Sequence, residues 1–337
     1  MSRQYLVGLG VGLLVTAVAL VTAVKAQAPE AKDKAKADTY KVSRTPWGDP
    51  DIQGIWNFGT ITPLQRPLKG EFADRAGLTP EEIKAINDKE ATRASVENRK
   101  NLDKTTDVEL AYNQEWWDRG VSAGRTSLIV DPPDGRLPPY TKAGAERLAL
   151  LEGGMGGNRR GFDSYASRAL NERCLVYRPV PIRSSGYNNN NQIVQGPGYV
   201  AMLQEQIHET RIIPLDGRPF TGDSIRPWLG VSRGHWEGDT LVVETKNFHR
   251  DSNYEGSGPN RVVTERFTRM ANDQMNYEFT VNDPTTWERP FTAQMPWRID
   301  EGPLYEYACH EGNYGMVNML RSERNLEKAR GSKSNRR

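Results

Sequence analysis

Side chains that carry metal or nucleophilic chemistry are scarce in this sequence of 337 residues, which has four histidines and two cysteines. The spacings H-E-x-x-H and C-x-x-C are absent, as are an Asp-rich calcium loop, a Walker phosphate loop and a Rossmann fingerprint. A nucleophilic serine is not favoured, because no expected strand leads into the glycine-rich stretch at 156–161. We therefore expect no metal site and no cofactor.

An excess of charge of one sign is missing as well. The chain has 45 Lys and Arg against 43 Asp and Glu, and residues 1–28 contain Arg3, Lys25 and no acidic residue. Without that segment the chain is formally neutral. A neutral protein has no field that gathers polyanions, so we expect no nucleic-acid partner.

Long hydrophobic runs are absent after residue 24. The run at 6–24 follows Arg3 and precedes an A-x-A triplet at 26–28, which predicts a signal peptide over 1–28 with cleavage after Ala28. The run has 19 residues, just enough to span a bilayer, so a retained anchor is the alternative. We expect a periplasmic or secreted protein without stable membrane insertion after cleavage, and the oligomeric state stays open.

The two cysteines are read in this exported setting. In an oxidising compartment Cys174 and Cys309 are expected to form one disulfide. Two buried thiols are the alternative. A catalytic thiol is less favoured, because nothing beside Cys174 resembles an activating partner, although Cys309 precedes His310.

Composition and periodicity divide the rest of the chain. We expect a disordered leader at 29–41, a helical, loop-rich portion at 42–173, an antiparallel β domain at 174–324 and a basic solvated tail at 325–337. Helices are expected at 79–98, 108–119 and 141–152, and a loop with anchoring tryptophans at 47–56.

Beyond Cys174 the hydrophobic period changes to two. Strands are expected at 199–203, 207–213, 228–236, 240–247, 261–269, 274–281, 291–298 and 304–309. Successive strands joined by short turns indicate antiparallel sheet, which must hide one face and its edges. The fold class is therefore mainly β (α+β), with an antiparallel barrel or sandwich in the C-terminal half and the helical portion packed on it.

Several sequence blocks carry a family resemblance. RGHWEGDTLVVETKNF at 233–248, with PWGDPDIQGIW, RTSLIVDPPDGRLP, HETRIIPLDGRPF and YEYACHEGNYGM, resembles a family of exported bacterial proteins of uncharacterised function. The resemblance extends from Thr45 to about Arg324. It implies export and a common fold, and it brings no reaction, cofactor or catalytic residue.

Candidate catalytic groups are few. His208, expected within a strand that faces the barrel interior, is the candidate general base, with Glu265 or His310 nearby. Glu209 should face the opposite side of that strand and pair with Arg211. A hydrogen-bonded structural role for His208 is the alternative. Glycoside hydrolysis by two carboxylates also stays open, because several glutamates lie on or beside expected strands.

Aromatic residues are the stronger clue. On the expected C-terminal strands they are Tyr277, Phe279, Trp297, Tyr305 and Tyr307. They either fill a core or line a cavity for an apolar molecule. Our leading hypothesis is a protein that binds a small, largely apolar ligand in this cavity. The alternatives are a periplasmic lyase, isomerase or hydrolase with a histidine base, and a structural envelope protein that docks through its tryptophans.

Overall fold

The computed structural model describes residues 40–93, 118–151 and 162–334. In these ranges the chain forms three α-helices: α2 (Pro80–Arg93), α4 (Lys142–Leu151) and α5 (Tyr314–Ser334). The predicted signal peptide at 1–28 and nearly all of the expected helix at 108–119 lie outside the described residues. None of the helices in the described ranges is both long and apolar enough to cross a bilayer.

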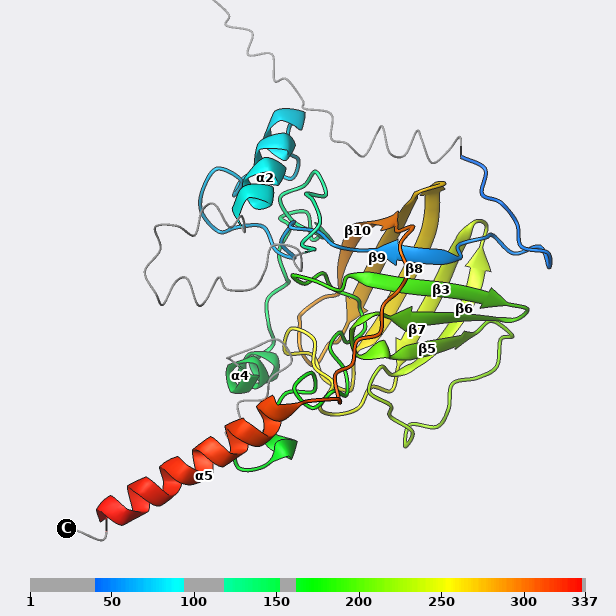
Figure 1. The fold of residues 1–337 in the computed structure, drawn as a ribbon. Coiled ribbons are helices and arrows are strands. Elements are labelled where there is room, and N and C mark those ends of the chain that lie inside the picture. Colours follow the sequence, from blue (N-terminus) through cyan, green and yellow to red (C-terminus); the bar gives the residue numbers. More distant parts are fainter. Residues whose placement is uncertain (1–39, 94–117, 152–161, 335–337) are drawn as a thin grey trace, which may run out of the picture.

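Ten antiparallel strands form one sheet. They are β1 (Gly54–Asn57), β2 (Ile129–Asp131), β3 (Asn190–Gly196), β4 (Tyr199–Gln204), β5 (Thr210–Pro214), β6 (Val231–Glu237), β7 (Thr240–Lys246), β8 (Val262–Ala271), β9 (Gln274–Asn282) and β10 (Phe291–Ile299). Nine follow the order β5-β4-β3-β1-β10-β9-β8-β7-β6, and β2 pairs with β10. The sheet curls into a nearly closed barrel, which confirms the predicted fold class (Figure 1).

The barrel also recruits the N-terminal part of the chain. β1 was expected to be loop, yet it lies between β3 and β10, with Trp56 opposite both Asn191 and Ile299. The side chain of Trp56 is fully buried. The boundary expected at residue 173 therefore does not separate the barrel from the rest of the chain.

Side chains alternate between the inside and the outside of the barrel. On β9 the buried residues are Met275, Tyr277, Phe279 and Val281, and they stand opposite Trp297, Met295, Ala293 and Phe291 of β10. The intervening residues are more exposed. Burying side chains of this size stabilises a fold by about 1.5–3 kcal/mol each, so this predicted alternation is what builds the core.

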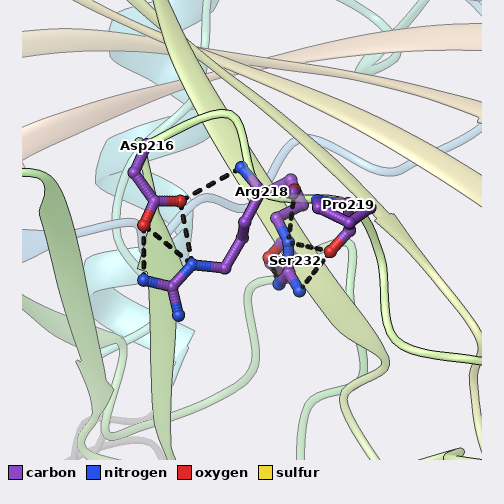
Figure 2. A network of polar contacts seen from close by, with 5 residues as sticks. Asp216, Arg218, Pro219 and Ser232 are labelled. Carbon is purple, nitrogen blue, oxygen red and sulfur yellow. Dashed lines mark hydrogen bonds and ion pairs between the residues drawn. The ribbon is translucent and has the colours of Figure 1, made fainter.

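The barrel has a seam between its end strands. β5 and β6 lie side by side, but among the described residues no ladder of backbone hydrogen bonds joins them. The loop after β5 is held to β6 by Arg233, which donates to the carbonyl oxygens of Arg218 and Pro219 at 2.9–3.1 Å. Within this loop, Asp216 accepts hydrogen bonds from the side chain and backbone of Arg218 (Figure 2).

Three expected elements are wrong. The strand at 207–213 begins at Thr210, because residues 206–208 form a 3-10 helix, η4 (Gln206–His208). The segment 304–309 forms no strand, since none of the described strands pairs with it. Residues 325–334, expected as solvated tail, continue helix α5, which extends away from the barrel (Figure 1).

The disulfide prediction is confirmed. Cys174 and Cys309 are bonded, with their Cα atoms 5.7 Å apart. The bond links the segment between β2 and β3 to the segment that follows β10. The capping box expected at the start of α2 is also present: the Thr79 hydroxyl accepts from the backbone of Glu82, and the Glu82 carboxylate accepts from the backbone of Thr79.

Candidate functional site

The barrel interior contains a charged network. Arg211 of β5 reaches Glu265 of β8, with Nη1 2.5 Å from Oε2 and Nη2 3.2 Å from Oε1. The hydroxyl of Tyr277 donates to Glu265 at 2.8 Å and accepts from the backbone N–H of Ile182 at 3.0 Å. Burial and the adjacent carboxylate raise the pKa of Tyr277 well above its usual value.

The groups of this network are buried and already bonded to one another, so they are not accessible to a substrate. Glu265 is 0% exposed, and Arg211 and Tyr277 occupy its oxygens. Neither His208 nor His310 bonds to it, and both histidines are exposed. The three predicted catalytic residues are therefore not brought together, and Glu265 acts as the buried partner of Arg211.

The predicted aromatic ligand contacts divide into two groups. Tyr277, Phe279 and Trp297 lie inside the barrel but pack on one another, with 4.9 Å between the ring centres of Tyr277 and Trp297. Each is at most 1% exposed, so no water-sized void adjoins them. Tyr305 is 72% exposed and Tyr307 lies outside the sheet, because the strand expected for them does not form. The inner three are core side chains, and the outer two do not line the barrel.

A second set of polar groups lies where β3 begins and β4 ends, which we call the barrel mouth. Asn191 stands opposite Gln204, whose backbone N–H donates to the carbonyl oxygen of Glu209. Asn191 and Gln204 are buried, and Glu209 shares the inward parity of Arg211 two residues later. The three side chains thus form one inward-facing row across β3, β4 and the start of β5.

The mouth is rich in buried atoms without partners. Five of the buried, unpartnered side-chain atoms in the described residues belong to Asn191 and Glu209 of this row and to Gln206 of η4, between β4 and β5: Nδ2 and Oδ1 of Asn191, Nε2 and Oε1 of Gln206, and Oε2 of Glu209. Asn191 is 0% exposed and Gln206 1%. Leaving a buried polar group unpaired costs about 1–3 kcal/mol, so native proteins pair nearly all of them. The mouth is therefore an unsatisfied polar site.

The turn that presents these groups is strained. Ile207 and His208 both have left-handed backbones, with φ of 61° and 43°. Such a conformation is costly for a β-branched residue, and strain of this kind gathers at functional sites. Sequence analysis expected His208 to point inward and Glu209 outward. The turn reverses this: His208 is exposed, and Glu209 is partly buried.

Within the mouth, the carboxyl group of Glu209 has a shifted pKa. Burial raises its pKa from 4.5 to about 7. The pairing with Arg211 expected from sequence is wrong, because the Arg211 guanidinium binds Glu265. A carboxyl group with a pKa near 7 can accept or donate a proton at neutral pH.

Residues 176–189 lead directly into β3, so the segment ends beside the mouth. Arg178 holds this segment together by donating to the carbonyl oxygen of Arg183 and to Oδ1 of Asn189. Its guanidinium lies 4.9 Å from the ring centre of Phe58, and burial lowers its pKa to about 10. Together with the bond from the Ile182 N–H to the Tyr277 hydroxyl, these contacts tie the segment to the barrel interior.

Sequence reasoning overlooked two features. Residues 230–234 spell G-x-S-x-G, but Ser232 lies within β6, is 3% exposed and bonds to the hydroxyl of Thr245 at 2.9 Å. It is no nucleophile elbow, which requires an exposed serine at a strand-to-helix turn. The other feature is the inward row itself. From sequence, the asparagine run at 188–191 is interpreted as a loop tip that offers at most a polar rim contact for a ligand, and the buried position of Asn191 is not predicted.

The described residues contain no group of three His, Cys, Asp or Glu side chains arranged to hold a metal ion. Comparison with known proteins adds no assignment: no family model, no curated protein and no solved structure matches the chain. Membership of the exported bacterial family therefore stays a prediction from the quoted sequence blocks.

Proposed function

We propose that this protein binds a small, largely apolar molecule inside the barrel mouth, with the polar group of the ligand held by Asn191, Gln206 and Glu209. The observation that carries the proposal is the set of five buried, unpartnered polar atoms on these side chains. A ligand that pairs them removes a cost that the free protein bears. The next inward-facing residues are Ile193 and Met202, each 1% exposed, which suit an apolar body.

The donor and acceptor pattern indicates the polar group. Three of the five atoms are oxygens, and Glu209 becomes negatively charged above a pKa of about 7. The cation of Arg211 is already neutralised by Glu265. An anionic ligand would be repelled by ionised Glu209, and the guanidinium of Arg178 already donates to carbonyl and amide oxygens. The site therefore favours an amine or a hydroxyl over a carboxylate.

Ligand entry requires movement, because the lining side chains pack without water-sized gaps. The β5–β6 seam is the part of the barrel wall that lacks ladder hydrogen bonds. Opening there costs fewer backbone bonds than opening elsewhere, so we assign the entry route to this seam.

Three probes with the same tail test the proposal: octylamine, octanol and octanoate, titrated at pH 8 and followed by tryptophan fluorescence. Octylamine and octanol should bind, and octanoate should bind at least tenfold more weakly. Asn191→Leu should weaken the binding of octylamine and octanol, and Glu209→Gln should remove the discrimination against octanoate. Gln192→Leu is the matched control, because Gln192 precedes Ile193 on the opposite face of β3. Equal binding of all three probes, or no binding of any, contradicts the proposal.

An enzyme is the second candidate, on the single observation that the pKa of Glu209 lies near neutrality. Glu209 would then replace His208 as the proton-transferring group of the predicted lyase, isomerase or hydrolase. Turnover of a bound ligand that disappears in Glu209→Gln, while binding persists, would favour this candidate. Docking through tryptophans is less favoured, because Trp56, Trp287 and Trp297 are buried and the exposed Trp47 already donates its indole N–H to Asp49.

Export belongs to the same proposal. The apolar run at 6–24 and the A-x-A triplet support it, and a disulfide accords with an oxidising compartment. The intact mass of protein recovered from the native cell envelope tests it: a mature chain beginning at Pro29 is expected, and a retained Met1 contradicts cleavage.

A further inference from the structure

The disulfide borders a pocket that is separate from the barrel mouth in its lining residues. This pocket has a volume of about 350 Å³, opens to solvent, and is lined by residues that include Cys309, Tyr307, Asn171 and Glu311. Cys309 is partly exposed, whereas Cys174 is 4% exposed and does not line the pocket. The two cysteines of one bond therefore differ in access to solvent.

The same bond fastens helix α5 to the body of the protein. Between the disulfide and the helix, Asn313 donates to the carbonyl oxygen of Glu172 at 3.0 Å. Farther along α5, Arg324 donates to the carbonyl oxygens of Phe162 and Asp163 at 2.9 and 3.0 Å. All these acceptors lie in residues 162–174, the segment to which Cys309 is bonded. The covalent link and the helix contacts thus hold one another in place.

We propose that the pocket admits a small thiol that attacks Cys309. The Cys174–Cys309 bond is then a reducible clasp, by which we mean a covalent link whose reduction loosens helix α5 from residues 162–174. This inference does not depend on the ligand site in the barrel. It needs one co-reactant, a dithiol or two equivalents of a monothiol.

The exchange balances as follows. The incoming thiolate forms a new S–S bond with Sγ of Cys309, and the electron pair of the old bond leaves on Sγ of Cys174, which takes a proton from water. A second thiolate then attacks the sulfur of the added thiol. The products are two protein thiols and one oxidised reductant, so the protein gains the two electrons that the thiols lose.

The pocket walls select among thiols by charge. Glu311 contributes an exposed carboxylate, and Oδ1 of Asn171 is a buried acceptor without a partner among the described residues. The carboxylate of Glu172 is already paired with Arg168. A thiol with an ammonium group should therefore approach faster than one with a sulfonate. At separations of 4 Å or more in water the effect is about fivefold.

Reduction kinetics of the native, full-length protein test the proposal. Cysteamine, 2-mercaptoethanol and 2-mercaptoethanesulfonate are compared, each normalised to its rate with an unstructured peptide disulfide. The normalised rate should fall in that order, about fivefold per step at most. Glu311→Gln, an exposed substitution, should remove the difference. Rates that are independent of thiol concentration, or that show the same order in Glu311→Gln, overturn the pocket as the entry point.

Acid quenching identifies the sulfur that is attacked. Mass spectrometry of the quenched protein should find the first adduct on Cys309, and adducts divided equally between the two cysteines overturn the proposal. The clasp is tested by hydrogen exchange after complete reduction. Amides of α5 should exchange at least tenfold faster while those of β9 stay protected. Unchanged protection of α5 overturns the clasp.

Discussion

Arg211 and Glu265 form an ion pair across the interior of the barrel, with side-chain exposures of 5% and 0%. They belong to β5 and β8, which are not neighbours in the sheet. The pair therefore spans the interior rather than running along one strand pair. Removing one partner leaves the other charge buried and unpaired, which destabilises the folded state. The stability of single and double variants therefore tests whether the pair is buried as described.

Removal of one partner should be severe. Arg211→Leu leaves the Glu265 carboxylate buried without its cation and should lower the free energy of unfolding by about 3–5 kcal/mol. The double variant Arg211→Leu with Glu265→Leu should recover most of this loss. Denaturant unfolding measures both. Arg218→Leu, which breaks the exposed pair with Asp216, is the control and should leave the free energy of unfolding nearly unchanged.

The hydroxyl of Tyr277 should matter more than its ring. Tyr277→Phe keeps the packing but removes the acceptor for the Ile182 N–H and a donor to Glu265, so we expect a loss of about 2–3 kcal/mol. Exchange of the Ile182 amide should accelerate as well. Tyr305→Phe, at a side chain 72% exposed, should change stability by less than about 0.5 kcal/mol. Equal effects of the two variants would contradict the bridging role of Tyr277.

Substitutions at the mouth should stabilise the free protein. Asn191→Leu and Gln206→Leu each remove two buried, unpartnered polar atoms, so each should raise the free energy of unfolding by about 1–2 kcal/mol. Both should weaken octylamine binding. A variant that loses stability together with binding would show that these side chains are structural instead.

Glu209 should make stability fall with rising pH. Its pKa in the folded protein is about 7, above the ordinary 4.5, so the folded state holds more protons than the unfolded state between these values. The stabilising contribution of Glu209 is complete below pH 4.5 and is lost as the pH rises through about 7. Above that pH, the free energy of unfolding no longer changes on account of Glu209. It amounts to at most about 3 kcal/mol.

Denaturant midpoints between pH 4.5 and 8 measure this slope. Glu209→Gln should flatten it, whereas Glu244→Gln, at an exposed carboxylate on β7, should leave it unchanged. Octylamine affinity should rise through the same pH range, because ionised Glu209 attracts the ammonium group. An identical slope in Glu209→Gln and the parent would rule out Glu209 as its source.

Much of the barrel is encoded locally. The alternation through Met275, Tyr277, Phe279 and Val281 predicted β9 because each residue's face follows from its position alone. The disulfide was predictable because Cys174 has Cys309 as its single possible partner within the chain. Strand β1 was missed, since a short strand such as 54–57 is defined by its neighbours β3 and β10.

Elsewhere the local pattern misled for physical reasons. Ile207 favours strands, yet it lies in a left-handed turn that the chain needs to enter β5. Apolar and polar side chains alternate along residues 304–309 as they do in a strand. A strand also needs a neighbouring strand to pair with, and the alternation alone does not supply one. The inward row of Asn191 and Glu209 depends on the register of three strands, which the sequence does not reveal. The candidate site was therefore beyond sequence reasoning, although the neighbouring His208 had been singled out.

The most direct test of the ligand site is NMR of the side-chain amide groups with octylamine bound. Single substitutions assign the NH₂ signals of Asn191 and Gln206, and that of Gln192 serves as the reference. The account predicts that saturating octylamine at pH 8 shifts the first two signals and leaves the third in place. Octylamine that binds without moving the Asn191 and Gln206 signals would contradict it.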